Sequence, residues 1–222
     1  MTRMWRAFWT RALYWRFWLF QRHRYDRLTL ETVDDITLLI LPQVFNPALF
    51  RTGALLLEVA KAYITPQTRV LDMGTGSGIG AVMCAKITPH VVAVDINPHA
   101  VRCAHINALL NEVSFEIYEG DLFAPIAHEV FDLILFNPPF FDGEPQTMLD
   151  RAWRSVDVIP RFIAGLQAHL SPHGFALVVL SSKGNIAQFL ALCADAGIHA
   201  EKITQRDTWN ELVVVYRLGM KK

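Results

Sequence analysis

Residues that can do chemistry gather where apolar segments of this chain end. The run Phe131–Phe136 is typical of a buried strand, and Asn137-Pro138-Pro139-Phe140 follows it directly. Because proline brings no N–H donor, the Asn137 side-chain oxygen and the Pro138 carbonyl are free to accept hydrogen bonds. These two oxygens can bind and orient the N–H groups of a planar nitrogen, while Phe140 can stack on its flat face. We therefore expect a catalytic acceptor site at Asn137, Pro138 and Phe140.

A glycine-rich turn lies upstream of this motif. Val70–Asp72 forms another short apolar segment, and glycines then recur at every second position from Gly74 to Gly80. Such a turn lets the backbone approach a ligand closely, and the helix that follows offers free N–H groups. Val91–Asp95 ends in a carboxylate about 20 residues after the turn, a spacing that suits acceptance from two ribose hydroxyls. The two segments together predict a nucleoside-binding crevice.

These motifs occur in an order that resembles a known class of enzymes. Asp72-x-Gly-x-Gly-x-Gly78, Asp95, Gly120-Asp121 and Asn137-Pro-Pro-Phe140 look like the class I S-adenosylmethionine-dependent methyltransferases, specifically the N-methyltransferases with an Asn-Pro-Pro-aromatic motif. The resemblance covers roughly residues 44–217 and implies S-adenosyl-L-methionine as cofactor. It implies that the loop after Asp72 holds the methionine part, Asp95 the ribose and Asp121 the adenine amino group. The residues that it assigns to the cofactor are Asp72, Gly74, Thr75, Gly76, Gly78, Asp95, Ile96, Asp121, Leu122 and Asn137.

The methyl acceptor stays open among several classes. The motif, the run from Pro160 and the ending from Trp209 resemble the HemK/PrmC-like protein glutamine methyltransferases, which usually carry Tyr where this chain has Phe140. Asn137–Gly143 followed by Gln146–Asp150 resembles the RsmC-type rRNA guanine-N2 methyltransferases, which usually carry a second domain. We expect a protein acceptor, a glutamine amide of the kind found in release factors. The alternatives are an RNA base (guanine N2 or adenine N6), a small planar or membrane-associated metabolite, and a non-enzymatic binding module.

Composition predicts one domain with no net charge. The 222 residues are 52% hydrophobic, and 21 basic side chains balance 21 acidic ones, which disfavours a whole surface devoted to nucleic acid. The three cysteines Cys84, Cys103 and Cys193 lack paired spacing, and the histidines lack metal-ligand spacing. We therefore expect no disulfide framework, no metal site and a reducing, cytoplasmic location.

Residues 1–27 depart from this balance, because they carry seven arginines and four tryptophans against one aspartate. The arginines interrupt every apolar run, so neither a membrane-spanning helix nor a signal peptide is expected. Three interpretations stay open: peripheral contact with an anionic membrane, a helix packed on the catalytic domain as a lid, and contact with nucleic acid. We divide the chain into an aromatic and basic N-terminal helical extension, residues 1–30, and a methyltransferase domain, residues 31–222.

The elements that must position these residues alternate along the chain. Strands are expected at 36–41, 69–73, 90–95, 113–118, 131–136, 174–181, 198–205 and 211–217, and helices at 51–60, 78–87, 98–110, 152–170 and 184–196. This alternation predicts an α/β fold, a doubly wound and mostly parallel seven-stranded Rossmann-like sheet. In such a sheet, ligands bind at the carboxyl ends of the strands.

Overall fold

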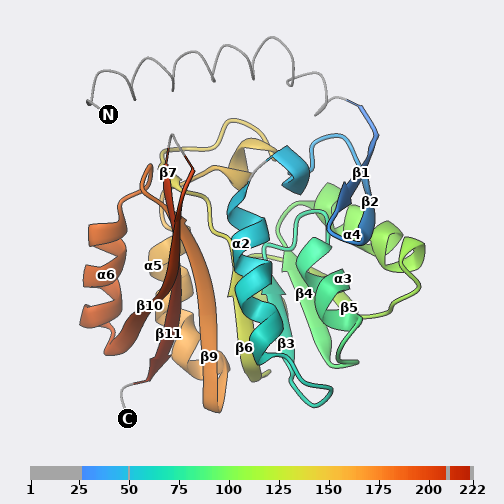
Figure 1. Ribbon diagram of the computed structural model, residues 1–222. Coiled ribbons are helices and arrows are strands. Elements are labelled where there is room, and N and C mark those ends of the chain that lie inside the picture. The colour runs from blue at the N-terminus through green and yellow to red at the C-terminus, as the bar shows by residue number, and fades with distance from the viewer. Residues whose placement is uncertain (1–26, 50, 209–210, 221–222) are drawn as a thin grey trace.

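A mixed sheet forms the centre of the protein (Figure 1). The computed structural model describes residues 27–49, 51–208 and 211–220, and within them seven strands pair in the order β10-β11-β9-β6-β3-β4-β5. The strands are β3 (Val70–Met73), β4 (Val91–Asp95), β5 (Glu116–Glu119), β6 (Phe131–Phe136), β9 (Leu170–Ser181), β10 (Ile198–Asp207) and β11 (Leu212–Met220). β11 runs antiparallel to both neighbours, while β5, β4, β3, β6 and β9 pair in parallel. The predicted mostly parallel, seven-stranded sheet is confirmed.

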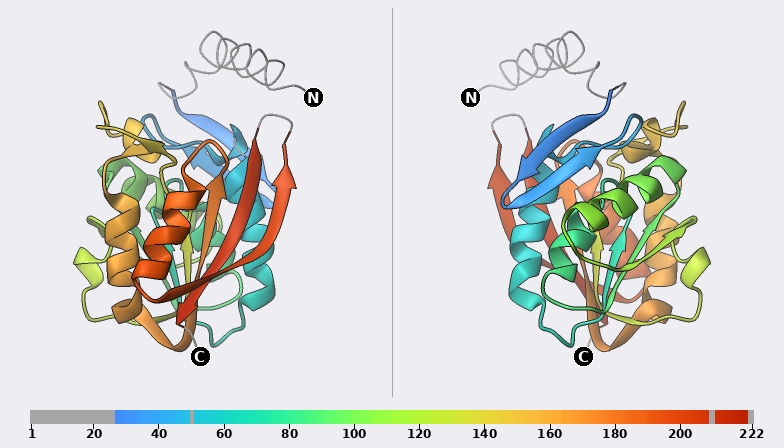
Figure 2. Two further views of the ribbon diagram at one scale, coloured as in Figure 1. Left: turned by 90° about the vertical axis from the view of Figure 1, so that its left-hand side faces the viewer. Right: turned by 90° about the vertical axis from the view of Figure 1, so that its right-hand side faces the viewer.

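Helices cover both faces of this sheet, as Figure 2 shows. α2 (Arg51–Ala60), α3 (Ile79–Ala85) and α4 (Pro98–Leu110) lie on one face, and α5 (Val158–Leu166) and α6 (Ile186–Asp195) lie on the other. The central strands are therefore buried on both sides, and neighbouring residues enter different cores. Val70 and Leu133 pack in the first core, whereas Leu71 and Ile134 pack in the second. The doubly wound arrangement follows from these two apolar surfaces.

A hairpin precedes the sheet and packs on the α3 and α4 side. It pairs β1 (Thr29–Val33) with β2 (Ile36–Ile40) in antiparallel register around Asp34, whose φ is 52°. The strand expected at 36–41 is present, whereas β1 was not expected. Thr29 and Leu30 of the expected helical extension thus belong to a strand, and residues 1–26 of that extension lie outside the described residues.

Asn107 of α4 ties the hairpin to the catalytic sheet. Its side-chain oxygen accepts from the Leu39 N–H at 2.7 Å, and its Nδ2 donates to the carbonyls of Leu39 at 3.0 Å and Ser77 at 2.8 Å. Asn107 is fully buried, so these bonds satisfy an amide that has no access to water. One side chain therefore connects β2 with the glycine-rich turn.

The helix expected at 152–170 is wrong at both ends. Backbone pairing holds the first part extended, because β7 (Phe141–Asp142) and β8 (Arg154–Ser155) form a small parallel ladder. The Phe141 N–H donates to the Trp153 carbonyl at 2.8 Å and the Gly143 N–H to the Ser155 carbonyl at 3.2 Å. The chain turns helical only in η5 (Asp150–Ala152) and again from Val158, and strand β9 already begins at Leu170. The remaining short helices are η2 (Pro47–Leu49), η3 (Lys61–Tyr63), η4 (Ala124–Ile126) and η6 (Gln167–His169).

Among the residues that the structure describes, no helix is long and apolar enough to cross a membrane.

Candidate active site

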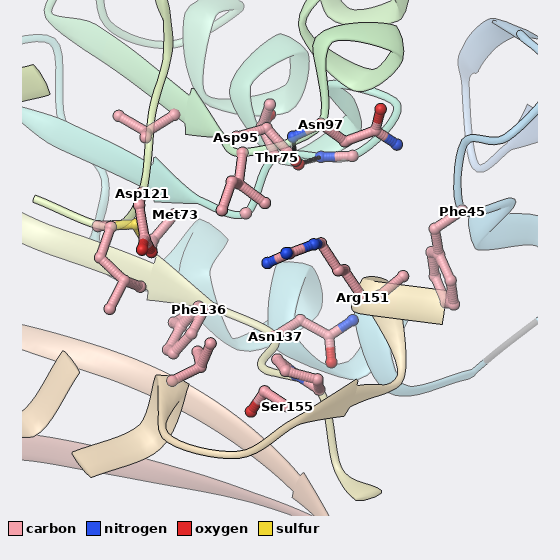
Figure 3. Close-up of a pocket in the computed structure, with 18 of the residues that line it drawn as sticks. Phe45, Met73, Thr75, Asp95, Asn97, Asp121, Phe136, Asn137, Arg151 and Ser155 are labelled. Atoms are coloured by element: carbon pink, nitrogen blue, oxygen red, sulfur yellow. Dashed lines mark hydrogen bonds between the residues drawn. The ribbon is translucent and has the colours of Figure 1, made fainter. Parts of the chain in front are cut away.

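One cavity of about 490 Å³ opens at the carboxyl ends of β3, β4 and β6 (Figure 3). This volume lies within the range of small-molecule and cofactor sites. Most residues that the sequence assigned to a cofactor line it: Asp72, Gly74, Thr75, Gly76, Asp95, Ile96, Asp121, Leu122 and Asn137. Gly78, Pro138 and Phe140 are absent from the lining.

Asp72 supports the glycine-rich turn from below. One oxygen of its buried carboxylate accepts from the Thr75 hydroxyl at 2.6 Å and from the Ala81 N–H at 2.9 Å. Burial raises the pKa of Asp72 to about 6, because loss of water outweighs these two hydrogen bonds, and the nearby charge of Asp95 raises it further. Asp72 thus holds both ends of the loop while keeping one face toward the cavity.

At two positions of the turn only glycine fits, because neighbouring atoms lie where a side chain would begin. Gly78 has a φ of 84°, and a Cβ there would lie 2.8 Å from the Ala104 Cα. At Gly80 a Cβ would lie 2.7 Å from both carboxylate oxygens of Asp72. Gly78 therefore shapes the turn through helix packing without lining the cavity, and Gly80 lets α3 approach Asp72.

Asp95 ends β4 and faces the glycine loop. Its carboxylate accepts from the Gly76 N–H at 2.8 Å and from the Asn97 N–H at 2.8 Å. Burial raises the pKa of Asp95, and the backbone hydrogen bonds from Asn97, Gly76 and Ile96 oppose that rise. The Asn97 side chain in turn accepts from the His99 N–H at the start of α4. This strand-to-helix junction fixes the carboxylate in one orientation.

Asp121 lies after β5 on another side of the cavity. Its carboxylate accepts from Nη1 of Arg161 at 2.7 Å, and Arg161 also pairs with Asp157 at 3.0 Å. The next residue, Leu122, has a φ of 51°, which non-glycine residues adopt rarely. A strained backbone beside a cavity is frequent at ligand sites, and it accompanies the acid that the sequence singled out.

Asn137 follows β6 directly and lies beside Ser155 at the cavity (Figure 3). Its side-chain oxygen is buried, and no donor within the described part of the chain reaches it. A buried acceptor without a partner is costly, by about 1–3 kcal/mol, so such a group is usually kept for a ligand. The polar cavity wall at Asn137 therefore fits a ligand that brings an N–H.

The other two residues of the predicted acceptor site lie behind Asn137. Pro138 is buried and Phe140 packs against the second core cluster, where its carbonyl approaches Gly184. The structure does not bring the Phe140 side chain to the cavity wall; Pro139 lines it instead.

Sequence reasoning missed the outer wall of the cavity. Residues 144–158, between β7 and α5, contribute Met148, Arg151, Ser155 and Val156. The helix expected from residue 152 hid the positions of Ser155 and Val156, and the run Gln146–Asp150 was interpreted only as a likeness to a family. Phe45 lines the cavity beside this segment, and its ring meets Trp153 edge-to-face with centroids 6.1 Å apart.

Within residues 27–49, 51–208 and 211–220, no group of three or more His, Cys, Asp or Glu side chains is placed to hold a metal ion.

The sheet order, the glycine-rich turn and the cavity are those of the class I methyltransferase fold. The relatives below make this chain an S-adenosylmethionine-dependent N-methyltransferase. The family model described as "Methyltransferase small domain" matches residues 35–202, and the chain belongs to this family.

Three known proteins illustrate the relationship. A putative protein N5-glutamine methyltransferase of Methanocaldococcus jannaschii is 33% identical over 68% of this chain and 78% of its own length. The ribosomal RNA small subunit methyltransferase C of Haemophilus influenzae is 34% identical over 68% of this chain, but over only 43% of its own length. The 16S rRNA N2 G1207 methyltransferase of T. thermophilus, solved with AdoMet and guanosine, has a TM-score of 0.68 at 20% identity and covers 88% of this chain and 50% of its own. At that identity the last likeness concerns the fold alone.

Proposed function

We propose that this enzyme methylates a planar nitrogen, and that the acceptor is the side-chain amide of a protein glutamine. The observation that carries the proposal is the buried Asn137 side-chain oxygen, which lines the cavity and has no donor among the described residues. An amide NH₂ supplies the missing donor.

The carboxylates of the cavity support our assignment of the cofactor. We assign the ribose hydroxyls to Asp95, whose position the Gly76 and Asn97 N–H groups fix. We assign the adenine amino group to Asp121, with Leu122 beside it, and the methionine part to the loop Gly74–Gly76. When bound, S-adenosylmethionine supplies an electrophilic methyl group to the acceptor.

The residues of the chain then orient the nucleophile. An amide nitrogen is a poor nucleophile because its lone pair is delocalised into the carbonyl. A hydrogen bond from this nitrogen to the Asn137 oxygen aligns it and enriches the lone pair. The Pro138 carbonyl, the second acceptor that the sequence predicted, belongs to a residue that does not line the cavity. The nitrogen loses a proton easily once it is alkylated, so no strong general base is required. Phe140 packs against the second core cluster. Stacking on the acceptor, the role that the sequence predicted for Phe140, requires a movement of its side chain into the cavity.

The outer wall favours a protein over RNA. Between residues 141 and 161 four acidic side chains (Asp142, Glu144, Asp150 and Asp157) outnumber three arginines (Arg151, Arg154 and Arg161). Apolar side chains are exposed in the same segment: Phe141 is 38%, Met148 41% and Val156 61% accessible. Nucleic-acid sites are usually basic, whereas exposed apolar groups beside a cavity suit a peptide.

An acceptor assay tests this choice. Cell extract is incubated with the enzyme and methyl-labelled S-adenosylmethionine, and the labelled fraction is hydrolysed and analysed by mass spectrometry. We expect label in protease-sensitive material as N5-methylglutamine, at an initial rate roughly 100-fold lower with the Asn137→Ala variant. Label in ribonuclease-sensitive material alone would contradict the protein proposal.

An RNA base is the second candidate. The similarity to the H. influenzae rRNA methyltransferase supports it, and guanine N2 or adenine N6 offers the same planar NH₂ to Asn137. In this case the assay yields N2-methylguanosine or N6-methyladenosine.

For residues 1–27 we propose peripheral contact with an anionic membrane, from a cytoplasmic location. Their arginines and tryptophans support the contact, and the free, buried Cys84, Cys103 and Cys193 support a reducing compartment. A chain truncated at Leu28 should lose flotation with anionic vesicles and keep its melting temperature. Unchanged flotation would contradict the membrane contact, and a lowered melting temperature would favour the packed lid.

A further inference from the structure

The outer wall contains three arginines, and two of them already have acidic partners. Arg154 pairs with Asp150 at 3.4 Å, and Arg161 pairs with Asp121 and Asp157. Arg151 lines the cavity, yet no carboxylate within the described residues pairs with it. Its charge is therefore available to a ligand.

The side chain of Arg151 extends into the cavity. Figure 3 shows its guanidinium group between Asn137 and the side where Asp95 lies, with Phe45 behind it. Arg151 belongs to η5, which the ladder of β7 and β8 holds over the cavity. The side chain therefore points into the space that a ligand would occupy, although Arg151 as a whole is exposed to solvent.

The anionic group of the cofactor needs a partner in this place. With adenine at Asp121, ribose at Asp95 and the methyl group beside Asn137, the methionine end lies at the loop Gly74–Gly76, and Arg151 lines the same cavity. Acidic side chains dominate the inner wall, and they repel a carboxylate. A carboxylate that leaves water requires a cation or several donors, and a guanidinium offers a planar pair of N–H groups.

We propose, on the cofactor placement argued above, that Arg151 binds the methionine carboxylate of the cofactor. The contact links the cofactor to the segment that carries Met148 and Val156. Cofactor binding therefore fixes the wall against which the acceptor docks, and the cofactor binds before the acceptor.

Two product-like ligands test the assignment by calorimetry on the full chain. S-adenosylhomocysteine carries the carboxylate, and 5′-methylthioadenosine lacks the whole amino-acid end. Arg151→Gln should weaken S-adenosylhomocysteine binding roughly tenfold and leave 5′-methylthioadenosine binding unchanged, since one charge-assisted contact is lost. The matched control is Arg102→Gln, an exposed arginine on α4 that does not line the cavity, which should change neither affinity.

Hydrogen exchange provides a second readout. S-adenosylhomocysteine should slow amide exchange in residues 143–157 of the wild-type chain, and 5′-methylthioadenosine should not. In Arg151→Gln, the two ligands should have the same effect on these amides.

The outcomes separate this proposal from the cofactor placement. Equal affinities of wild type and Arg151→Gln for S-adenosylhomocysteine overturn the role of Arg151, as does an equal loss for both ligands. Asp95→Ala should weaken both ligands, because both carry the ribose. If Asp95→Ala weakens neither, the cofactor placement is wrong, whatever Arg151 does.

Discussion

Replacing Asp72 with asparagine should stabilise the protein at neutral pH and destabilise it in acid. Burial raises the pKa of Asp72 from 3.8 to about 6, so the folded chain binds a proton more tightly than the unfolded chain. Below a pH of about 4 both states hold the proton. The unfolded chain loses this proton near pH 4 and the folded chain only near pH 6, so the folded state loses about 3 kcal/mol of stability between these two pH values, at about 1.4 kcal/mol per pKa unit, and the loss is complete above pH 6.

Asp72→Asn removes the cost of the buried charge and adds the smaller cost of an unpaired amide group. The asparagine oxygen still accepts from Thr75 and Ala81, but its NH₂ group gains no obvious acceptor, at about 1–2 kcal/mol. Asp72→Asn should therefore be about 1–2 kcal/mol more stable than wild type at pH 7.5. At pH 4 it should be less stable by a similar amount.

Urea unfolding followed by circular dichroism, at intervals from pH 4 to pH 8, measures the difference. Asp95 also has a raised pKa, so it contributes to the pH dependence of unfolding in both proteins. Subtracting the wild-type curve of unfolding free energy against pH from that of Asp72→Asn removes most of this shared contribution. A difference that stays constant with pH would show that Asp72 titrates normally and would refute the reasoning. The ionised carboxylate also attracts the ammonium group of the cofactor, so the stabilised variant should bind S-adenosylhomocysteine less tightly.

Three further substitutions follow from the geometry. Asn137→Ala should reduce turnover on the order of 100-fold with nearly unchanged S-adenosylhomocysteine affinity, and calorimetry beside steady-state kinetics checks both. Gly80→Ala should lower the free energy of unfolding by about 2 kcal/mol or more, because its methyl group would lie 2.7 Å from the Asp72 carboxylate; an unchanged urea midpoint would contradict this. Asn107→Leu should lower it by about 3 kcal/mol and weaken cofactor binding, since buried backbone groups of Leu39 and Ser77 lose their partner; intact binding would show that the hairpin does not support the loop.

The regular elements could be predicted because their signals are local. Helix α2 spans the expected residues 51–60, and α4 spans 98–110, where Asn97 caps the first turn and Pro98 opens it. Both faces of the central strands are apolar, so the buried sheet was visible in the sequence.

The outer wall could not be predicted in the same way. Arg154–Ser155 becomes a strand only because Phe141–Asp142 pairs with it, and apolar periodicity contains no record of that pairing. The same holds for the contact of Arg161 with Asp121 across 40 residues. Hairpin strand β1 had a local signal, an alternating run before Asp34-Asp35, and this signal was overlooked.

The two-residue ladder of β7 and β8 also has an evolutionary consequence. Its backbone hydrogen bonds clamp the base of residues 143–153 and involve no side chain, so sequences of other composition can stand between them as long as the cation at Arg151 is kept. Insertions, deletions and exchanges in this stretch leave Asn137 and the glycine loop in register, since both lie before the clamp. The fold thereby separates a constant chemical step from an exchangeable recognition loop. Relatives with different acceptors can arise by changing one short segment, and a graft of this segment is the smallest unit for redesigning the acceptor.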